Sequence, residues 1–213
     1  MPRKMRYMLD AKDLACERGE RCLFSDISLA LKPGGFARLL GANGSGKTSL
    51  LRILAGLTRP AAGEVLWRGE KLGDIAEGYG REMLYLGHAP AVKDELSVAE
   101  NLMFSARLSG IAASDDQCRM ALEALGIGNL APLSARVLSQ GQRRRAALAR
   151  LALAVSLPLW LLDEPFAALD ENAISRVRAL AEAHLARGGM LVLTSHQEVP
   201  IAAGNTQTVN LDA

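Results

Sequence analysis

The residues most clearly suited to a chemical role lie in the segment GANGSGKT. This segment fits the pattern G-x-x-x-x-G-K-[ST] of phosphate-binding loops in full. Glycines let backbone N–H groups turn inward, and the start of a following helix adds partial positive charge. Lys47 would reach the β- and γ-phosphates, and the Thr48 hydroxyl would ligate Mg²⁺. The segment is therefore predicted to bind a nucleotide through Gly41, Ala42, Asn43, Gly44, Ser45, Gly46, Lys47 and Thr48.

Two acidic residues follow the apolar run in LWLLDEP, residues 159–165. A buried strand that ends at Asp163 would place a carboxylate beside the Mg²⁺ ion. Glu164 comes next and could accept a proton from an attacking water, or orient it. An acidic pair after apolar residues also occurs in many surface turns, so this prediction depends on the phosphate loop upstream. Together the two segments predict nucleotide hydrolysis.

A third segment, LSQGQRRRAALAR at 138–150, has the composition of another anion-binding helix N-terminus. The hydroxyl of Ser139 and the free amides near Gly141 and Gln142 would face a phosphate. A plainer alternative makes Ser139 an N-cap and the arginines at 143–145 a solvated helix start. The arginines also suggest nucleic acid, but one short run is weak evidence on a chain whose formal net charge is +2. No nucleic-acid partner is predicted.

These segments must be positioned by alternating strands and helices. Short strands with turns are expected over 8–40, a helix over 48–57, and a strand and turn over 63–72. The strands before the phosphate loop and before Asp163 are apolar throughout, which is typical of parallel strands covered on both faces. A strand at 190–196 is expected to precede a short tail. Helices are predicted at 97–111, 117–127, 143–155 and 171–188.

The predicted fold is therefore α/β, with a small N-terminal antiparallel β region and a helical subdomain. We expect one domain over 1–213, with a core at about 1–90 and 150–213 and the helical subdomain at about 91–149. The start of the chain is basic but has no apolar stretch behind it, so no signal peptide is predicted. The longest near-apolar run, 151–162, is too short to cross a bilayer and is read as a buried helix end plus a buried strand.

The segment 138–150 closely resembles the signature sequence of ABC ATPases, usually LSGGQ, with Gln140 in place of its third-position glycine. The resemblance runs from about Met8 to Asp212 and implies a P-loop NTPase of the ABC type that hydrolyses ATP with Mg²⁺. It also implies a homodimer, in which the signature of one copy contacts ATP held by the other. AALD, ending at Asp170, resembles the loop that couples the two sites. His196 resembles the histidine that contacts the γ-phosphate and holds Glu164 or the water.

Two positions depart from the general pattern of ABC ATPases. The family places an aromatic residue on adenine near the end of the first strand, where this sequence has Arg18, whose guanidinium can also stack on a base. The family also has a glutamine that senses Mg²⁺ and water at the start of the loop facing the membrane partner. His88 of YLGHAP occupies that position and can contact Mg²⁺-bound water through an imidazole nitrogen.

His88 and its neighbours suggest a narrower resemblance. YLGHAPAVKDELSVAENL, LSQGQRRRAALARL and TSHQEVP together resemble the ATP-binding subunits of transporters for cytochrome c biogenesis, described as haem exporters. This resemblance implies a peripheral protein on the cytoplasmic face of a bacterial inner membrane, working with separate membrane-embedded permease subunits. Its role would be to power haem export or the release of a haem-carrier complex.

Other functions remain open from the sequence. They are the ATPase subunit of another small ABC exporter, a soluble ABC ATPase of translation or DNA repair, a small-molecule kinase and a non-catalytic nucleotide-gated adaptor. A single phosphate loop and a short region at 96–135 argue against the soluble class, and LSQGQ argues against a kinase. The three cysteines form no CxxC pair, which favours free thiols in a reducing compartment over a metal site: Cys16, Cys22 and Cys118.

Overall fold

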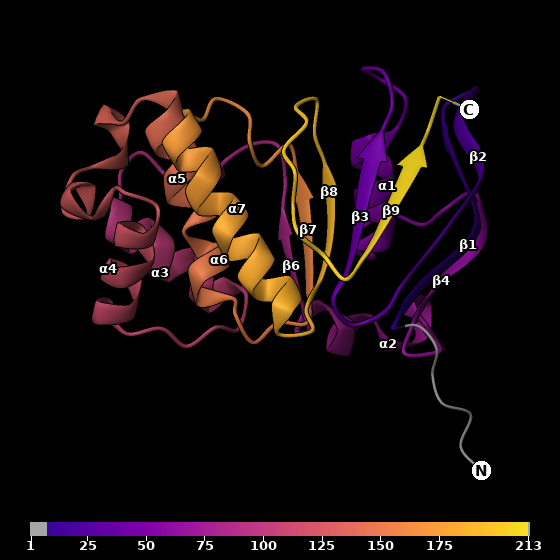
Figure 1. The fold of residues 1–213 in the computed structure, drawn as a ribbon, viewed down its shortest axis with the longest axis horizontal. Coiled ribbons are helices and arrows are strands. Elements are labelled where there is room, and N and C mark those ends of the chain that lie inside the picture. Colours follow the sequence, from indigo (N-terminus) through magenta and orange to yellow (C-terminus); the bar gives the residue numbers. More distant parts are fainter. Residues whose placement is uncertain (1–7, 213) are drawn as a thin grey trace, which may run out of the picture.

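A five-stranded parallel sheet forms the centre of the molecule (Figure 1). The structure, a computed structural model, describes residues 8–212. The first seven residues, on which part of the signal-peptide prediction rests, and residue 213 lie outside the described part. The order of strands in the sheet is β6 (Met83–Leu86), β7 (Leu159–Asp163), β8 (Met190–Thr194), β3 (Gly35–Leu40) and β9 (Asn205–Asn210).

Both faces of this sheet are covered by apolar clusters. On β7, Leu159 and Leu161 belong to the cluster that includes α1 (Lys47–Leu54). Trp160 and Leu162 belong to the opposite cluster, which includes α7 (Glu171–Ala186). Successive side chains on a strand point to opposite faces, so a strand buried on both sides needs an unbroken apolar run. The interpretation of this run as a buried parallel strand is confirmed.

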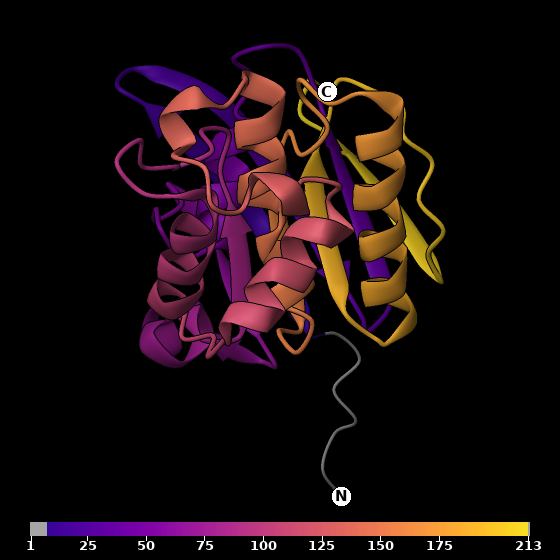
Figure 2. The ribbon, with the colours of Figure 1, turned by 90° about the vertical axis from the view of Figure 1, so that its left-hand side faces the viewer.

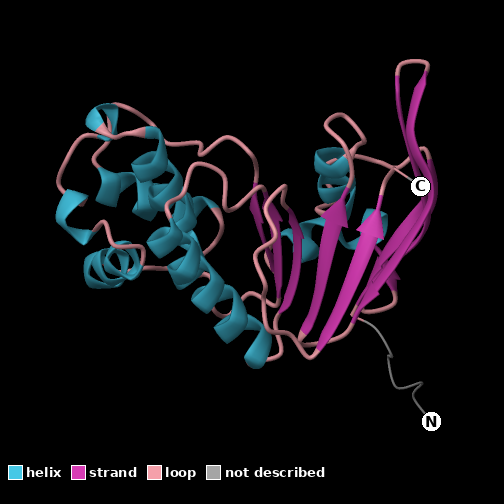
Figure 3. Cartoon of the chain, turned by 45° about the horizontal axis from the view of Figure 1, so that its top comes forward, coloured by secondary structure: helices cyan, strands magenta, loops and turns pink. Residues whose placement is uncertain are grey.

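A four-stranded antiparallel sheet lies on the α1 side of the parallel sheet (Figures 1 and 3). Three of its four strands share one hydrophobic cluster with α1, so this helix is enclosed between the two sheets. The predicted N-terminal antiparallel region is confirmed. The order of strands in this sheet is β2 (Arg21–Leu31), β1 (Leu9–Arg18), β4 (Ala62–Trp67) and β5 (Glu70–Lys71). Helix α2 (Leu72–Gly80) follows β5 in the chain.

The chain between β6 and β7 is largely helical and gathers at one end of the molecule, which lies on the left in Figure 1 and faces the viewer in Figure 2. The helix predicted at 143–155 begins earlier, at Gln140, because Ser139 supplies its N-cap, and it ends sooner. Within residues 8–212, no helix is both long and apolar enough to cross a membrane. The helices of this region are α3 (Val98–Leu108), α4 (Asp115–Ala124), α5 (Gln140–Leu148) and α6 (Arg150–Leu153), with short 3₁₀ turns η1 (Gly128–Leu130) and η2 (Ala135–Val137).

The C-terminal segment predicted as a tail instead forms β9, which pairs in parallel with β3. Its side chains are half-buried or exposed because it is the edge strand, so it lacks the apolar run that marks β7 and β8. The side-chain amide of Gln207 also bonds the main chain of Ala30 on β2, accepting from its N–H at 3.4 Å and donating to its carbonyl at 2.9 Å. The tail therefore joins the two sheets.

Candidate active site

The phosphate loop lies between β3 and the N-terminus of α1, as its sequence context requires. Gly41, Gly44 and Gly46 have φ values of 147°, 84° and 103°, which side chains other than glycine's rarely tolerate. A Cβ at Gly46 would also come within 2.8 Å of the Phe24 ring. No side chain caps α1, so the amides at its start stay available to an anion.

The side chain of Lys47 is buried and folds back onto the main chain of its own loop. Its ammonium group donates to the carbonyl oxygens of Gly41 at 2.6 Å and Ala42 at 2.9 Å. The carboxylate of Asp212, beyond β9, accepts from the N–H of Ala42 at 2.8 and 2.9 Å. The hydroxyl of Ser45 is buried without a partner, so the loop retains an unused polar group that a phosphate oxygen could meet.

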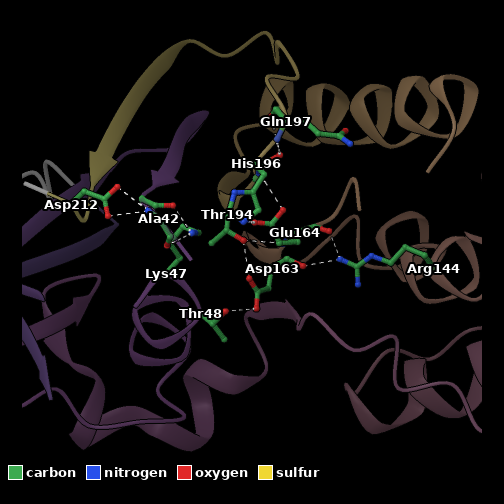
Figure 4. Close-up of polar contacts among 12 residues, drawn as sticks. Ala42, Lys47, Thr48, Arg144, Asp163, Glu164, Thr194, His196, Gln197 and Asp212 are labelled. Atoms are coloured by element: carbon green, nitrogen blue, oxygen red, sulfur yellow. Dashed lines mark hydrogen bonds and ion pairs between the residues drawn. The ribbon is translucent and has the colours of Figure 1, made fainter. Parts of the chain in front are cut away.

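Asp163 ends β7 and is 2% exposed. Its two carboxylate oxygens accept hydrogen bonds at 2.8 Å from the hydroxyls of Thr48 and Thr194 (Figure 4). Strand β8 thus fixes one oxygen, and the other lies against the residue predicted to ligate Mg²⁺. A carboxylate and a hydroxyl side by side are hard oxygen donors of the type that Mg²⁺ takes together with phosphates and water. The residues present therefore fit this ion.

Glu164 has an unusual backbone, with φ of 50° in the left-handed region. Its N–H donates to the Thr194 hydroxyl at 2.8 Å. One carboxylate oxygen accepts from the N–H of His196 at 3.3 Å, and the other lies 3.5 Å from the His196 ring and is buried without a hydrogen-bond partner. That second oxygen therefore keeps an unused acceptor position.

One cavity of about 480 Å³ brings most of the predicted site residues together. The phosphate loop forms one side of it and the acidic pair another. Arg18 and Leu23 border it from the antiparallel sheet, where the base of a nucleotide was predicted to stack. The predicted residues that line it are Arg18, Asn43, Gly44, Gly46, Lys47, Thr48, His88, Asp163, Glu164 and His196.

The predicted signature residues lie outside that cavity. Ser139 is the N-cap of α5: its hydroxyl accepts from the Gln142 N–H at 3.2 Å, and the Gln142 side chain accepts from the Ser139 N–H at 2.9 Å. A Cβ on Gly141 would lie 2.9 Å from the Ala168 carbonyl oxygen, so this position packs closely on the segment that ends at Asp170. Asp170 itself caps α7. The plainer alternative was therefore correct about the N-cap.

The same alternative was wrong about one of the three arginines. Arg144 is only 5% exposed and is not a solvated residue. Its guanidinium donates to the backbone carbonyls of Gly87 and His88. It also donates to the backbone carbonyls of Asp163 and Glu164 (Figure 4). Burial lowers the pKa of this guanidinium, and the nearby acids partly offset that shift. The sequence analysis missed this role, together with those of Thr194 and Asp212; only the arginine run at 143–145 gave a signal.

The three cysteines are free thiols in the structure, and burial raises the pKa of Cys16 and Cys118. Within the described residues, no cluster of three or more histidine, cysteine or acidic side chains could hold a metal ion. The residues predicted to hold Mg²⁺, Thr48 and Asp163, lie side by side and do not belong to such a cluster.

Comparisons with known proteins identify the family of this chain. The family model described as ABC transporter matches residues 24–167. A cytochrome c biogenesis ATP-binding export protein, CcmA, from Aromatoleum aromaticum is 49% identical over 93% of this chain and 93% of its own length. The protein of the same name from Escherichia coli K12 is 43% identical over 96% of each.

Solved structures give the same result for the fold. The ATP-binding subunit of an ABC transporter superposes with a TM-score of 0.78 at 25% identity, covering 89% of this chain and 79% of that one. A dimeric ATP-binding cassette bound to ADP and phosphate gives 0.78 at 24% identity, with 89% and 88% covered. The predicted fold class and the predicted ATP-hydrolysing class of transporter subunit are confirmed, and the kinase alternative is excluded. The chain belongs to the ABC transporter family and, within it, to the cytochrome c biogenesis ATP-binding export proteins.

Proposed function

We propose that the cavity at the N-terminus of α1 binds ATP with Mg²⁺ and hydrolyses it to drive a membrane-embedded partner. One observation carries this proposal: unpaired helix amides, the Lys47 ammonium and the pair Asp163 and Glu164 border a single cavity of about 480 Å³. A triphosphate is the ligand that requires both cationic and metal-binding groups on opposite sides.

The residues divide the work as follows. Lys47 now bonds two carbonyls of its own loop and would exchange them for phosphate oxygens. Thr48 and Asp163 would hold Mg²⁺, which when bound neutralises charge on the phosphates. His88 lies at the cavity edge and could contact water on the metal, and Arg18 could stack on the base.

Hydrolysis needs a base for the attacking water. The free oxygen of Glu164 would orient the water and take its proton as the oxygen attacks the γ-phosphorus and the bond to the β-phosphate oxygen breaks. The backbone N–H of His196 donates a hydrogen bond to the Glu164 carboxylate and would hold that carboxylate in position. The side chain of His196 would contact the transferred phosphate. The transition state is then stabilised by groups that are already in place.

A second copy of the chain would complete each site. Ser139, Gly141 and Gln142 at the start of α5 would meet the ATP held by the partner's phosphate loop, and Asp170 would couple the two sites. The dimeric cassette with ADP and phosphate supports this arrangement. The relatives' name supports a role in cytochrome c biogenesis and export. The proposed role is the ATPase of a haem exporter or of haem-carrier release, at the cytoplasmic face of a bacterial inner membrane. Another small exporter is the alternative.

Replacing Glu164 tests the catalytic part. Glu164→Gln removes the proton acceptor but keeps the shape, so the rate of ATP hydrolysis should fall by about 10²–10⁴-fold while nucleotide affinity is kept. A phosphate-release assay and equilibrium titration with labelled ATP measure the two quantities. A normal rate in this variant would contradict the assignment of Glu164.

The biological role needs a separate experiment. Tagged chain should be recovered from detergent-solubilised membranes of its host and its partners identified by mass spectrometry. Small membrane proteins of cytochrome c maturation are the expected partners. An unrelated permease would favour the alternative exporter, and recovery with ribosomes or DNA would return the soluble class of ABC ATPase.

A further inference from the structure

Arg144 is buried between two loops that both reach the candidate active site. One amino group of its guanidinium donates to the carbonyls of Gly87 at 3.2 Å and His88 at 3.0 Å. The other donates to the carbonyls of Asp163 at 2.7 Å and Glu164. The first loop follows β6, and the second follows β7. A single side chain therefore connects the backbone on either side of the catalytic cavity.

The contact with Glu164 bears on its strained backbone. A left-handed conformation costs a residue other than glycine about 1–2 kcal/mol, so neighbouring contacts must maintain it. At Glu164 the N–H is held by Thr194 and the carbonyl by Arg144. These two bonds fix the peptide groups on either side of the α-carbon and so determine where the carboxylate points.

Arg144 also lies on the same helix as the predicted signature residues. Helix α5 begins at Gln140 beside the cap Ser139, and Arg144 follows about one turn later. A helix is a stiff element, so a displacement at its N-terminus moves Arg144 and with it the carbonyls of His88 and Glu164. The neighbouring Arg143 differs: it pairs with Asp94 and bonds the carbonyls of Arg136 and Leu138, all outside the cavity.

We propose that Arg144 is a positioning residue, which couples the signature end of α5 to Glu164 and to the His88 loop of the same chain. The proposal rests on the hydrolysis proposed above for this site. Arg144 already bonds both loops in the single chain, so a shift of α5 caused by the ATP of a second copy against Ser139 would reach both loops and adjust the direction of the Glu164 carboxylate toward the attacking water. Arginine suits this task because its planar fork reaches two loops at once, whereas a lysine ammonium is a single point.

The test compares Arg144→Lys with the matched control Arg143→Lys on the same helix. Arg144→Lys keeps the charge but cannot span both loops, so kcat for ATP hydrolysis should fall by about 10–100-fold, as expected for a misplaced catalytic group. The dissociation constant for an ATP analogue that is not hydrolysed should stay within about twofold, since Arg144 touches no phosphate-loop residue. Arg143→Lys should leave both quantities near those of the unmodified chain.

Combining the substitution with Glu164→Gln makes the result specific. If Arg144 acts through Glu164, Arg144→Lys should add little to the loss caused by Glu164→Gln in single-turnover hydrolysis. Multiplied losses, an unchanged kcat in Arg144→Lys, or an equal loss in Arg143→Lys would overturn the proposal. If Arg144→Lys does not fold, Arg144→Gln, which can donate to one loop only, takes its place with the same expected result. A normal rate in Glu164→Gln alone would instead overturn the proposed function.

Discussion

The N-termini of α1 and α5 are both predicted to contact phosphate, and the chain prepares them differently. At α1, Gly46 stands at the N-cap in a left-handed conformation and no side chain bonds the first turn. At α5, Ser139 and Gln142 form a complete capping box, with both side chains bonded to backbone N–H groups. In a single chain, the backbone N–H groups at the start of α1 are therefore not bonded by a side-chain cap. At α5, the capping box already bonds some of the corresponding N–H groups.

This difference shows what distinguishes a ligand site from an ordinary helix start. The helices α3 and α4 begin with the same capping box, formed by Ser97 with Glu100 and by Ser114 with Gln117. The box therefore does not mark α5 as a nucleotide site. What sets α5 apart is Gly141 packed on Ala168 and Arg144 buried against the active site. A nucleotide that contacts α5, as proposed above, would be held by a second copy of the chain.

The largest expected effect comes from removing the cation at the open terminus. Lys47→Ala should weaken ATP binding by about 100-fold, since about two charge-assisted hydrogen bonds to phosphate are lost at about 1.5 kcal/mol each. Titration with labelled ATP at low protein concentration measures this in the single chain. Lys71→Ala is the control, because Lys71 is exposed and pairs with Glu64 away from the cavity. An unchanged dissociation constant for Lys47→Ala would remove α1 from the nucleotide site.

The next effect concerns the fold that carries both helices. His184 on α7 is buried, stacks on Trp160 and bonds the Met190 carbonyl, and burial lowers its pKa from 6.5 to about 4. The unfolded chain binds this proton below about pH 6.5, whereas the folded chain resists it until about pH 4. The contribution of His184 to the free energy of unfolding is therefore fully present above about pH 6.5. It falls as the pH drops, by about 2 kcal/mol at about pH 5.

Urea unfolding at about pH 7 and about pH 5 measures this loss. His184→Phe keeps an aromatic ring against Trp160 and removes the proton site, so its pH-dependent loss should be smaller by about 2 kcal/mol. An equal loss in both proteins would show that His184 does not control acid stability. Because the folded chain loses stability below about pH 6.5, experiments on the two helix termini should be done above this pH.

The smallest effect separates capping from ligand binding. Ser139→Ala and Ser114→Ala each remove one capping hydroxyl, and each should lower the free energy of unfolding by about 1 kcal/mol. Only Ser139→Ala should also lower the ATPase rate, because only α5 is proposed to face the partner's nucleotide. Urea unfolding and a phosphate-release assay on both variants provide the comparison. Equal ATPase rates in the two would reduce Ser139 to a structural cap.

The parts of the fold that were predictable have local signals. The runs before the phosphate loop and before Asp163 are apolar enough to predict buried strands. The glycines and Lys47 indicate the phosphate site. Strand β9 was missed because an edge strand carries polar residues on exposed positions. Asp212 and Thr194 were missed because their partners, Ala42 and Asp163, lie far away in the chain.

Arg144 shows why such contacts escape a reading of the sequence. Nothing in RRR distinguishes the buried arginine from its neighbours, since burial is decided by which face of α5 meets the ends of β6 and β7. Its partners are backbone carbonyls, which every residue has, so no complementary side chain points to it. Only the packing of the helices against the parallel sheet reveals the residue.

The most direct test of the shared site mixes two inactive variants. Lys47→Ala disables the phosphate loop, and Ser139→Asp keeps a good N-cap on α5 but sets a carboxylate against the partner's ATP. In a mixed dimer, one site carries both changes and the other carries neither. Mixing equal amounts should restore about a quarter of the normal ATPase rate, since about half of the dimers are mixed and each has one intact site. No gain in rate on mixing would contradict a nucleotide site built from two chains.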